Sequence, residues 1–136
     1  MDTVQLVDAV CQRLAAAGLA QYQTLTGETV GPASAPPVFV RYFQAAPDEA
    51  VLVTARPLAR PANPDETVTR WQIQIRVRAQ NVMRVDNLAD SISRALTEHY
   101  AWAHPVQRVF YQSTIPLGRD RAGRDERSDN YEAISN

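Results

Sequence analysis

The chain alternates strictly between apolar and polar residues from position 70 to position 80. Its apolar positions are Trp71, Ile73, Ile75, Val77 and Ala79, and its polar positions are Arg70, Gln72, Gln74, Arg76, Arg78 and Gln80. Because successive side chains of a β-strand point to opposite faces, this period of two predicts a long strand. One face is expected to be buried and the other polar, which is typical of a sheet covered on one side only.

Two other segments space their apolar residues as an α-helix does. The first follows a cap at Asp2 or Thr3 and ends near Gly18, which suits a left-handed stop. Its apolar face consists of Leu6, Val7, Val10, Cys11 and Leu14. The second helix is predicted over residues 83–100, with Leu88, Ile92 and Leu96 recurring on one face beside Ala89 and Ala95. We expect this face to pack on the apolar side of the 70–80 strand.

Further strands are predicted over residues 38–43, 51–55 and 106–115, followed by a last short strand ending at Ile134. On the 106–115 strand one side is expected to hold Val109, Tyr111, Ser113 and Ile115. Residues 19–37 are expected to be irregular, with a short strand near 22–25 as an option. Two loops are predicted: residues 56–67 are proline-rich, and residues 116–127 are charged and begin with strand-breaking Pro116 and Gly118.

This order of elements predicts a single α+β domain over residues 1–136. Two helices are expected to pack on one face of a mixed, largely antiparallel sheet of four to five strands. A chain of 136 residues is long enough to bury a substantial core.

The net charge of −1 provides no overall positive field for nucleic acid or an anionic membrane. No apolar run approaches the length of a membrane span, and Asp2 and Asp8 argue against a signal peptide, so no membrane partner is expected. All 14 basic residues are arginine. This usage fits fixed ion pairs at an interface, and it fits GC-rich coding equally well. Cys11 is the only cysteine, so an internal disulfide is excluded.

The candidate chemical groups do not assemble into a predicted active site. His99 and His104 are five residues apart and Pro105 ends the helix, so the two imidazoles do not share one helical face, and no cysteine or carboxylate cluster completes a metal site. Cys11 is expected to be a small core residue. Asp86 and Asp90 lie near the start of the second helix, where a catalytic carboxylate pair is the less favoured interpretation. We therefore predict no catalytic, metal-binding or cofactor-binding residues.

The charged loop favours an assembly surface. Arg119, Asp120 and Arg124 are expected to dock onto a neighbouring subunit or another component, with residues 116–126 mobile in the free protein. The alternative is a hairpin that packs back on its own sheet with Leu117 as its anchor.

The basic stripe of Arg70, Arg76 and Arg78 is either a solvated sheet face or a surface that contacts a subunit or lines a channel. An RNA-binding sheet would stack bases on exposed aromatic residues. Trp71 instead shares the apolar face, so nucleic-acid recognition is disfavoured.

Several short segments together resemble one known family. They are residues 74–78 (Gln-Ile-Arg-Val-Arg), the helix over 88–96, the turn Pro116-Leu117-Gly118-Arg119-Asp120, Gly123-Arg124, and Asn130-Tyr131. In their order these segments resemble the phage minor capsid and tail terminator proteins of long-tailed, non-contractile, siphovirus-type phages. The resemblance is good over residues 38–134 and looser over the first helix, and its most specific element is the Pro-Leu-Gly-Arg-Asp turn.

The resemblance implies a structural virion protein without catalysis or cofactors. Such proteins form a ring, here expected to be a homohexamer, that ends tail-tube polymerisation at the head-proximal end of the tail. The implied partners are the tail tube protein and a head-side connector or stopper protein at the neck, where head and tail join. DNA only passes through the lumen, and assembly takes place in the cytoplasm of the host bacterium. A small monomeric enzyme or ligand-binding domain is the alternative.

Overall fold

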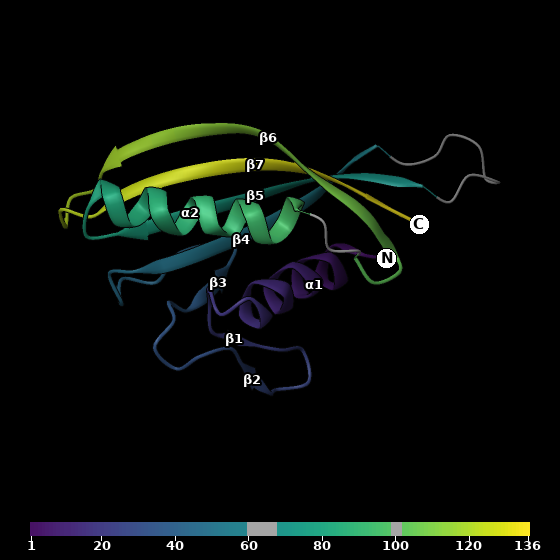
Figure 1. The fold of residues 1–136 in the computed structure, drawn as a ribbon, viewed down its shortest axis with the longest axis horizontal. Coiled ribbons are helices and arrows are strands. Elements are labelled where there is room, and N and C mark those ends of the chain that lie inside the picture. Colours follow the sequence, from purple (N-terminus) through teal and green to yellow (C-terminus); the bar gives the residue numbers. More distant parts are fainter. Residues whose placement is uncertain (60–67, 99–101) are drawn as a thin grey trace.

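The computed structural model describes residues 1–59, 68–98 and 102–136, and Figure 1 shows the arrangement of these segments. The described elements follow one another as α1 (Thr3–Ala16), β1 (Tyr22–Gln23), β2 (Thr29–Val30), β3 (Val38–Val40), β4 (Ala50–Ala59), β5 (Thr69–Ala79), α2 (Val82–Thr97), β6 (Val106–Arg119) and β7 (Asp125–Ser135).

Five of the described strands form one sheet in the order β3-β4-β5-β7-β6. β3 runs parallel to β4, and every other neighbouring pair is antiparallel. Both helices lie on the same side of this sheet (Figure 1), α1 against β4 and α2 against β5, β6 and β7. β1 and β2 pair separately as a small antiparallel ribbon. The predicted α+β class, with two helices on one face of a mixed sheet, is confirmed.

Local sequence signals define both ends of α1. Asp2 and Gln5 form a capping box, in which the Gln5 N–H donates to Asp2 Oδ1 and the Asp2 N–H donates to Gln5 Oε1, each at 2.8 Å. At the other end, Gly18 has φ +78°. The N–H groups of Gly18 and Leu19 donate to the carbonyls of Ala15 and Leu14 at 3.0 Å, which is the Schellman pattern.

The apolar face of β5 is the centre of the core. Trp71, Ile73, Ile75, Val77 and Ala79 are all at most 1% exposed. They are covered by the buried stripe of α2, which consists of Val85, Ala89, Ile92 and Leu96, and they share one core with the buried face of α1. Ala89, Ile92 and Leu96 are buried as predicted, whereas Leu88 is only half-buried and Val85, which was not predicted, is buried one turn before Ala89.

Edge strands account for the main differences from the predicted loops. β4 continues through Pro57 to Ala59, with a register shift at that point, where β3 no longer pairs with it. The rest of the predicted 56–67 loop, residues 60–67, lies outside the described residues. β6 continues through Pro116 and Gly118 to Arg119, so the predicted 116–127 loop is reduced to a turn over residues 120–124. Proline and glycine are tolerated here because the strands are at edges and bulged.

Three predicted boundaries also differ. β3 ends at Val40 rather than at residue 43, because Arg41 leaves the extended conformation with φ +77°. α2 ends at Thr97, and residues 99–101 lie outside the described residues. On β6 a register shift between Tyr111 and Ser113 interrupts the alternation. Val109 is therefore buried, whereas Tyr111, Ser113 and Ile115 are exposed.

Truncating the centre of β5 should destabilise the protein. We expect Ile75→Ala to lower the free energy of unfolding by about 2–5 kcal/mol, because it removes a fully buried side chain and leaves a cavity. Ile115→Ala, the same change at a position that is 51% exposed, is the matched control and should have little effect. Urea denaturation monitored by tryptophan fluorescence measures both. Equal, small losses would show that the β5 face is not packed.

Candidate functional site

Arg78 binds the backbone of the connection between β3 and β4. It is 2% exposed although it lies on the sheet face opposite the helices. Its Nε donates to the Asp48 carbonyl at 3.1 Å and its Nη2 to the Pro47 carbonyl at 2.6 Å. Its guanidinium also lies 4.4 Å from the centre of the Phe43 ring. Burial, and secondly the charge of Arg124, lower the pKa of Arg78. Arg78 is therefore committed to a fixed internal role.

Arg124 binds the same connection from the turn between β6 and β7. Its Nη1 donates to the Ala45 carbonyl at 2.5 Å and lies 3.8 Å from the Asp48 carboxylate. Its Nε donates to Asp120 Oδ2 at 2.9 Å. Two arginines from distant parts of the chain thus hold residues 45–48 against one end of the sheet, and cation–carbonyl hydrogen bonds of this kind are the stronger ones in proteins.

Asp120 organises the turn in which it lies. Its Oδ1 accepts hydrogen bonds from the N–H groups of Ala122 at 2.9 Å and Arg124 at 3.0 Å. These bonds, led by the one from the Arg124 backbone, lower the pKa of Asp120. Arg119 lies 3.5 Å from the carboxylate of Asp125, and its side chain is 65% exposed. The turn is therefore built on its own hydrogen bonds. Leu117 is 43% exposed and is not the anchor of the hairpin.

The two remaining arginines of the predicted stripe pair with β7. Arg76 Nη2 lies 2.6 Å from Glu126 Oε2, and Arg70 Nε lies 2.5 Å from Glu132 Oε1. The hydrogen bond from Arg70 lowers the pKa of Glu132. The stripe is thus charge-paired across the sheet and is not an open row of cations.

The structure brings together four of the six residues that the sequence singled out. Arg76, Arg78, Asp120 and Arg124 converge at the end of the sheet where the β6–β7 turn meets the β3–β4 connection. Arg119 belongs to the same hairpin and pairs with Asp125. Arg70 lies eight residues from Arg78 along β5, about 26 Å at the usual strand rise.

The sequence did not reveal a second ionic cluster, between α2 and β7. The guanidinium of Arg127 contacts Asp129 at 2.9 Å, Asp86 at 3.1 Å and Asp90 at 3.0 Å. Burial lowers the pKa of Arg127, but the hydrogen bonds to these three carboxylates, together with the charge of Asp129, outweigh that effect, and the net shift of the pKa is upward. A usable signal was present: Asp86 and Asp90 are four residues apart, which places both on one helix face.

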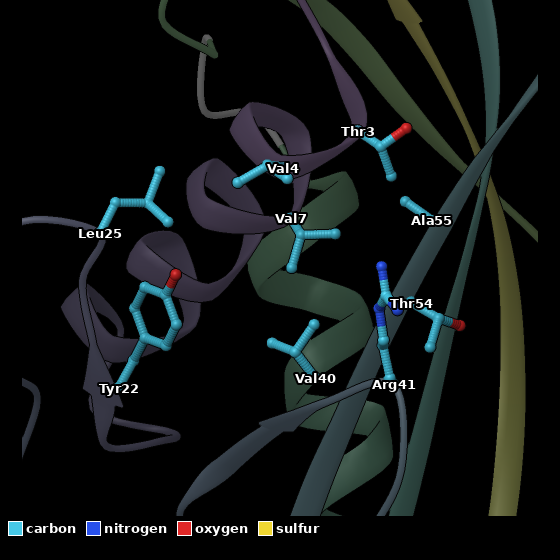
Figure 2. A pocket seen from close by; sticks show the side chains of 9 residues that line it. All are labelled: Thr3, Val4, Val7, Tyr22, Leu25, Val40, Arg41, Thr54 and Ala55. Atoms are coloured by element: carbon cyan, nitrogen blue, oxygen red, sulfur yellow. The ribbon is translucent and has the colours of Figure 1, made fainter.

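A pocket at the opposite edge of the sheet also escaped sequence reasoning. It lies between α1, the β1–β2 ribbon and the edge of β4, and Figure 2 shows its lining residues: Thr3, Val4, Val7, Tyr22, Leu25, Val40, Arg41, Thr54 and Ala55. Most of these side chains are apolar. Arg41 is the cationic residue among them, and its side chain extends past Thr54 toward Ala55 (Figure 2).

The candidate chemical groups lie apart from one another. Cys11 is fully buried in the core, as predicted, and burial, with the charge of Asp8 second, raises the pKa of its thiol. His104 is exposed, and His99 lies outside the described residues. Over the described parts of the chain, no group of three or more His, Cys, Asp or Glu residues is placed to hold a metal ion. Nor is any described helix long and apolar enough to cross a membrane.

Removing the donors of Arg78 should release the β3–β4 connection. We expect Arg78→Met, which keeps a long side chain, to lower the free energy of unfolding by about 1–3 kcal/mol, because two carbonyl oxygens lose their partner. Arg70→Met, at the exposed end of the same strand, is the matched control and should change stability little. Urea denaturation of both variants distinguishes the two positions. Identical behaviour would contradict the internal role of Arg78.

The turn carboxylate should make stability depend on acid pH. The depressed pKa of Asp120 stabilises the fold above the unfolded-state value, about 3.9, and this contribution is lost as pH falls through the folded-state pKa. Asp120→Asn should therefore lower Tm at pH 7 and give a smaller drop in Tm between about pH 5 and pH 2. Glu28→Gln, in the exposed β1–β2 ribbon, controls for the loss of one charge. Parallel Tm curves for wild type and Asp120→Asn would contradict the prediction.

Comparison with known proteins supplies the family. The chain matches the family model described as "Bacteriophage tail terminator protein" over residues 13–136. A search of curated proteins found no significant match. The matched region includes the last turn of α1, from residue 13, and every later element, so the whole sheet and α2 fall within it. The resemblance inferred from the Pro-Leu-Gly-Arg-Asp turn is confirmed, and the chain belongs to the bacteriophage tail terminator protein family.

Proposed function

We propose that this protein forms a ring that ends polymerisation of the tail tube and provides the tail-side surface for joining to the head. The observation that carries the proposal is the family match over residues 13–136. In this role the protein is a structural component of the virion, located at the head-proximal end of a siphovirus-type tail after assembly in the host cytoplasm. It acts without catalysis or a cofactor.

The proposed ring is a homohexamer. Its partners are the tail tube protein on one side and a head-side connector or stopper protein on the other, with DNA passing through the lumen without sequence-specific contacts. The sheet supports assembly because it has two unequal free edges, β6 and the β3–β4 edge, which a ring subunit can present to its neighbours.

The six charged residues singled out by sequence divide into two proposed roles. Arg70 and Arg119 have side chains that are 56% and 65% exposed, and they are available to a neighbouring subunit or tail component. Arg76, Arg78, Asp120 and Arg124 shape the end of the sheet by holding the β3–β4 connection and the β6–β7 turn. We propose that this end is an assembly surface whose backbone geometry these internal bonds fix in advance.

The alternative function is a small monomeric enzyme or ligand-binding domain. The family assignment favours the structural role, because tail terminators are structural proteins. A pocket with one cation, such as that around Arg41, is the feature that the alternative would use. Two results would favour the alternative: saturable binding of a small molecule, and a protein that stays monomeric while tails assemble.

Deletion of the gene from the phage should produce tails of uncontrolled length that fail to join heads, because nothing would stop growth of the tube. Electron microscopy of lysates gives the tail-length distribution and the fraction of joined particles. A plasmid copy of the wild-type gene should restore both, and a copy with a premature stop codon is the control. Normal, joined tails in the deletion strain would refute the proposal.

A further inference from the structure

Two surfaces with exposed apolar residues lie at opposite edges of the sheet. The β6 surface consists of Val82, Met83, Asp86, Asp90, Tyr111 and Leu117, and the β3 surface consists of Val4, Leu25, Val40, Arg41 and Tyr42. The apolar members of both surfaces are between 43% and 75% exposed. Because β3 and β6 are the outermost strands (Figure 1), about 19 Å apart at the usual strand spacing, the two surfaces face away from each other.

The β6 surface is acidic. Asp86 and Asp90 have side chains that are 52% and 56% exposed, and both share the single guanidinium of Arg127 with the buried Asp129. Three carboxylates therefore face one cation. Met83 lies three residues before Asp86 and seven before Asp90, so all three are on one side of α2. An apolar side chain and two partly neutralised carboxylates are thus presented together beside β6.

The β3 surface is basic and hollowed. The side chain of Arg41 makes no hydrogen bond or ion pair with another described residue. Asp8, the acidic residue beside this pocket, already accepts hydrogen bonds from Tyr22 Oη at 2.7 Å and Gln12 Nε2 at 2.6 Å. The backbone of Arg41 has φ +77°, a conformation that is uncommon for a residue other than glycine. That conformation ends β3 and lays the arginine side chain along the pocket wall (Figure 2).

We propose that the β3 surface of one subunit binds the β6 surface of a second copy of this chain, with Arg41 paired to Asp86 and Asp90. This inference rests on the proposed ring, and it names the surfaces through which the ring closes. The charges decide the geometry: a contact of either surface with its own copy would bring like charges together, whereas β3-to-β6 contact brings opposite charges together. Such head-to-tail contact between two different surfaces is the arrangement that generates closed rings.

Cysteine cross-linking in assembled tails tests the contact. A phage carrying Val40→Cys and Met83→Cys in its only copy of the gene should yield, after oxidation of purified tails, a ladder of covalent oligomers on a non-reducing gel. The wild-type protein, in which Cys11 is fully buried, gives the background level of cross-linking. Each single cysteine variant should give no dimer.

The cross-linking outcomes separate the two levels of the proposal. Dimers from either single variant would overturn the head-to-tail contact, and so would tails that contain the double variant but give no ladder. In both cases the terminator function would stand. Absence of the protein from purified tails would overturn the proposed function and the contact with it.

A charge exchange provides an independent test. Arg41→Asp and Asp86→Arg should each lower the yield of joined particles by about tenfold or more, as expected for a close charge pair at an interface. The double variant should recover most of that loss. Arg108→Asp, an exposed arginine at the other end of β6, is the matched control, and Tm measurements confirm that each variant is folded. Equal loss in the double variant and in both single variants would overturn the pairing.

Discussion

The burial of one face of β5 is the constraint on which the rest of the structure depends. Trp71, Ile73, Ile75 and Val77 are each at most 1% exposed, and a buried side chain of this size contributes about 1.5–3 kcal/mol. A shift in register by one residue would place Arg76 and Arg78 against the helices and the apolar set in solvent. The register of β5 against both neighbours is therefore fixed by the core, and every contact on the opposite face depends on that register.

The opposite face uses this fixed register to hold parts of the chain that have little hydrophobic anchoring. Arg78 and Arg124 bind the carbonyls of residues 45, 47 and 48, which belong to a connection without regular structure. A buried guanidinium is costly without partners, so the hydrogen bonds and the nearby Phe43 ring explain why Arg78 is tolerated at 2% exposure. Core packing and surface shape are thus linked through a single strand.

The sequence predicted what depends on neighbouring residues and missed what depends on distant ones. Alternation located β5 to within a residue, and Asp2 and Gly18 located both ends of α1. Pro116 and Gly118 wrongly indicated a strand end. Their effect at a bulged edge depends on which strand lies beside them, and the sequence alone does not show this. The contact of Arg78 with Pro47 and that of Arg127 with Asp86 also required the sheet order, since these partners are 31 and 41 positions away along the chain. The pocket around Arg41 depends on four separate segments of the chain and has no local signal in the sequence.

Exposed apolar residues alone would not determine which sheet edge of one subunit binds which edge of another. Both edges expose valine, leucine and tyrosine side chains. Apolar contacts would therefore be equally compatible with like pairing, in which an edge binds its own copy, and with unlike pairing, in which the β3 edge binds the β6 edge. Asp86 and Asp90 at one edge and Arg41 at the other make like pairing unfavourable, and such repulsion contributes to specificity more than to affinity. β6 is also interrupted by three register shifts, which break the row of free backbone groups that would otherwise accept any strand. In the proposed ring, selective charge and an interrupted edge would together favour one orientation of the neighbouring subunit, which a closed ring requires and an open aggregate does not.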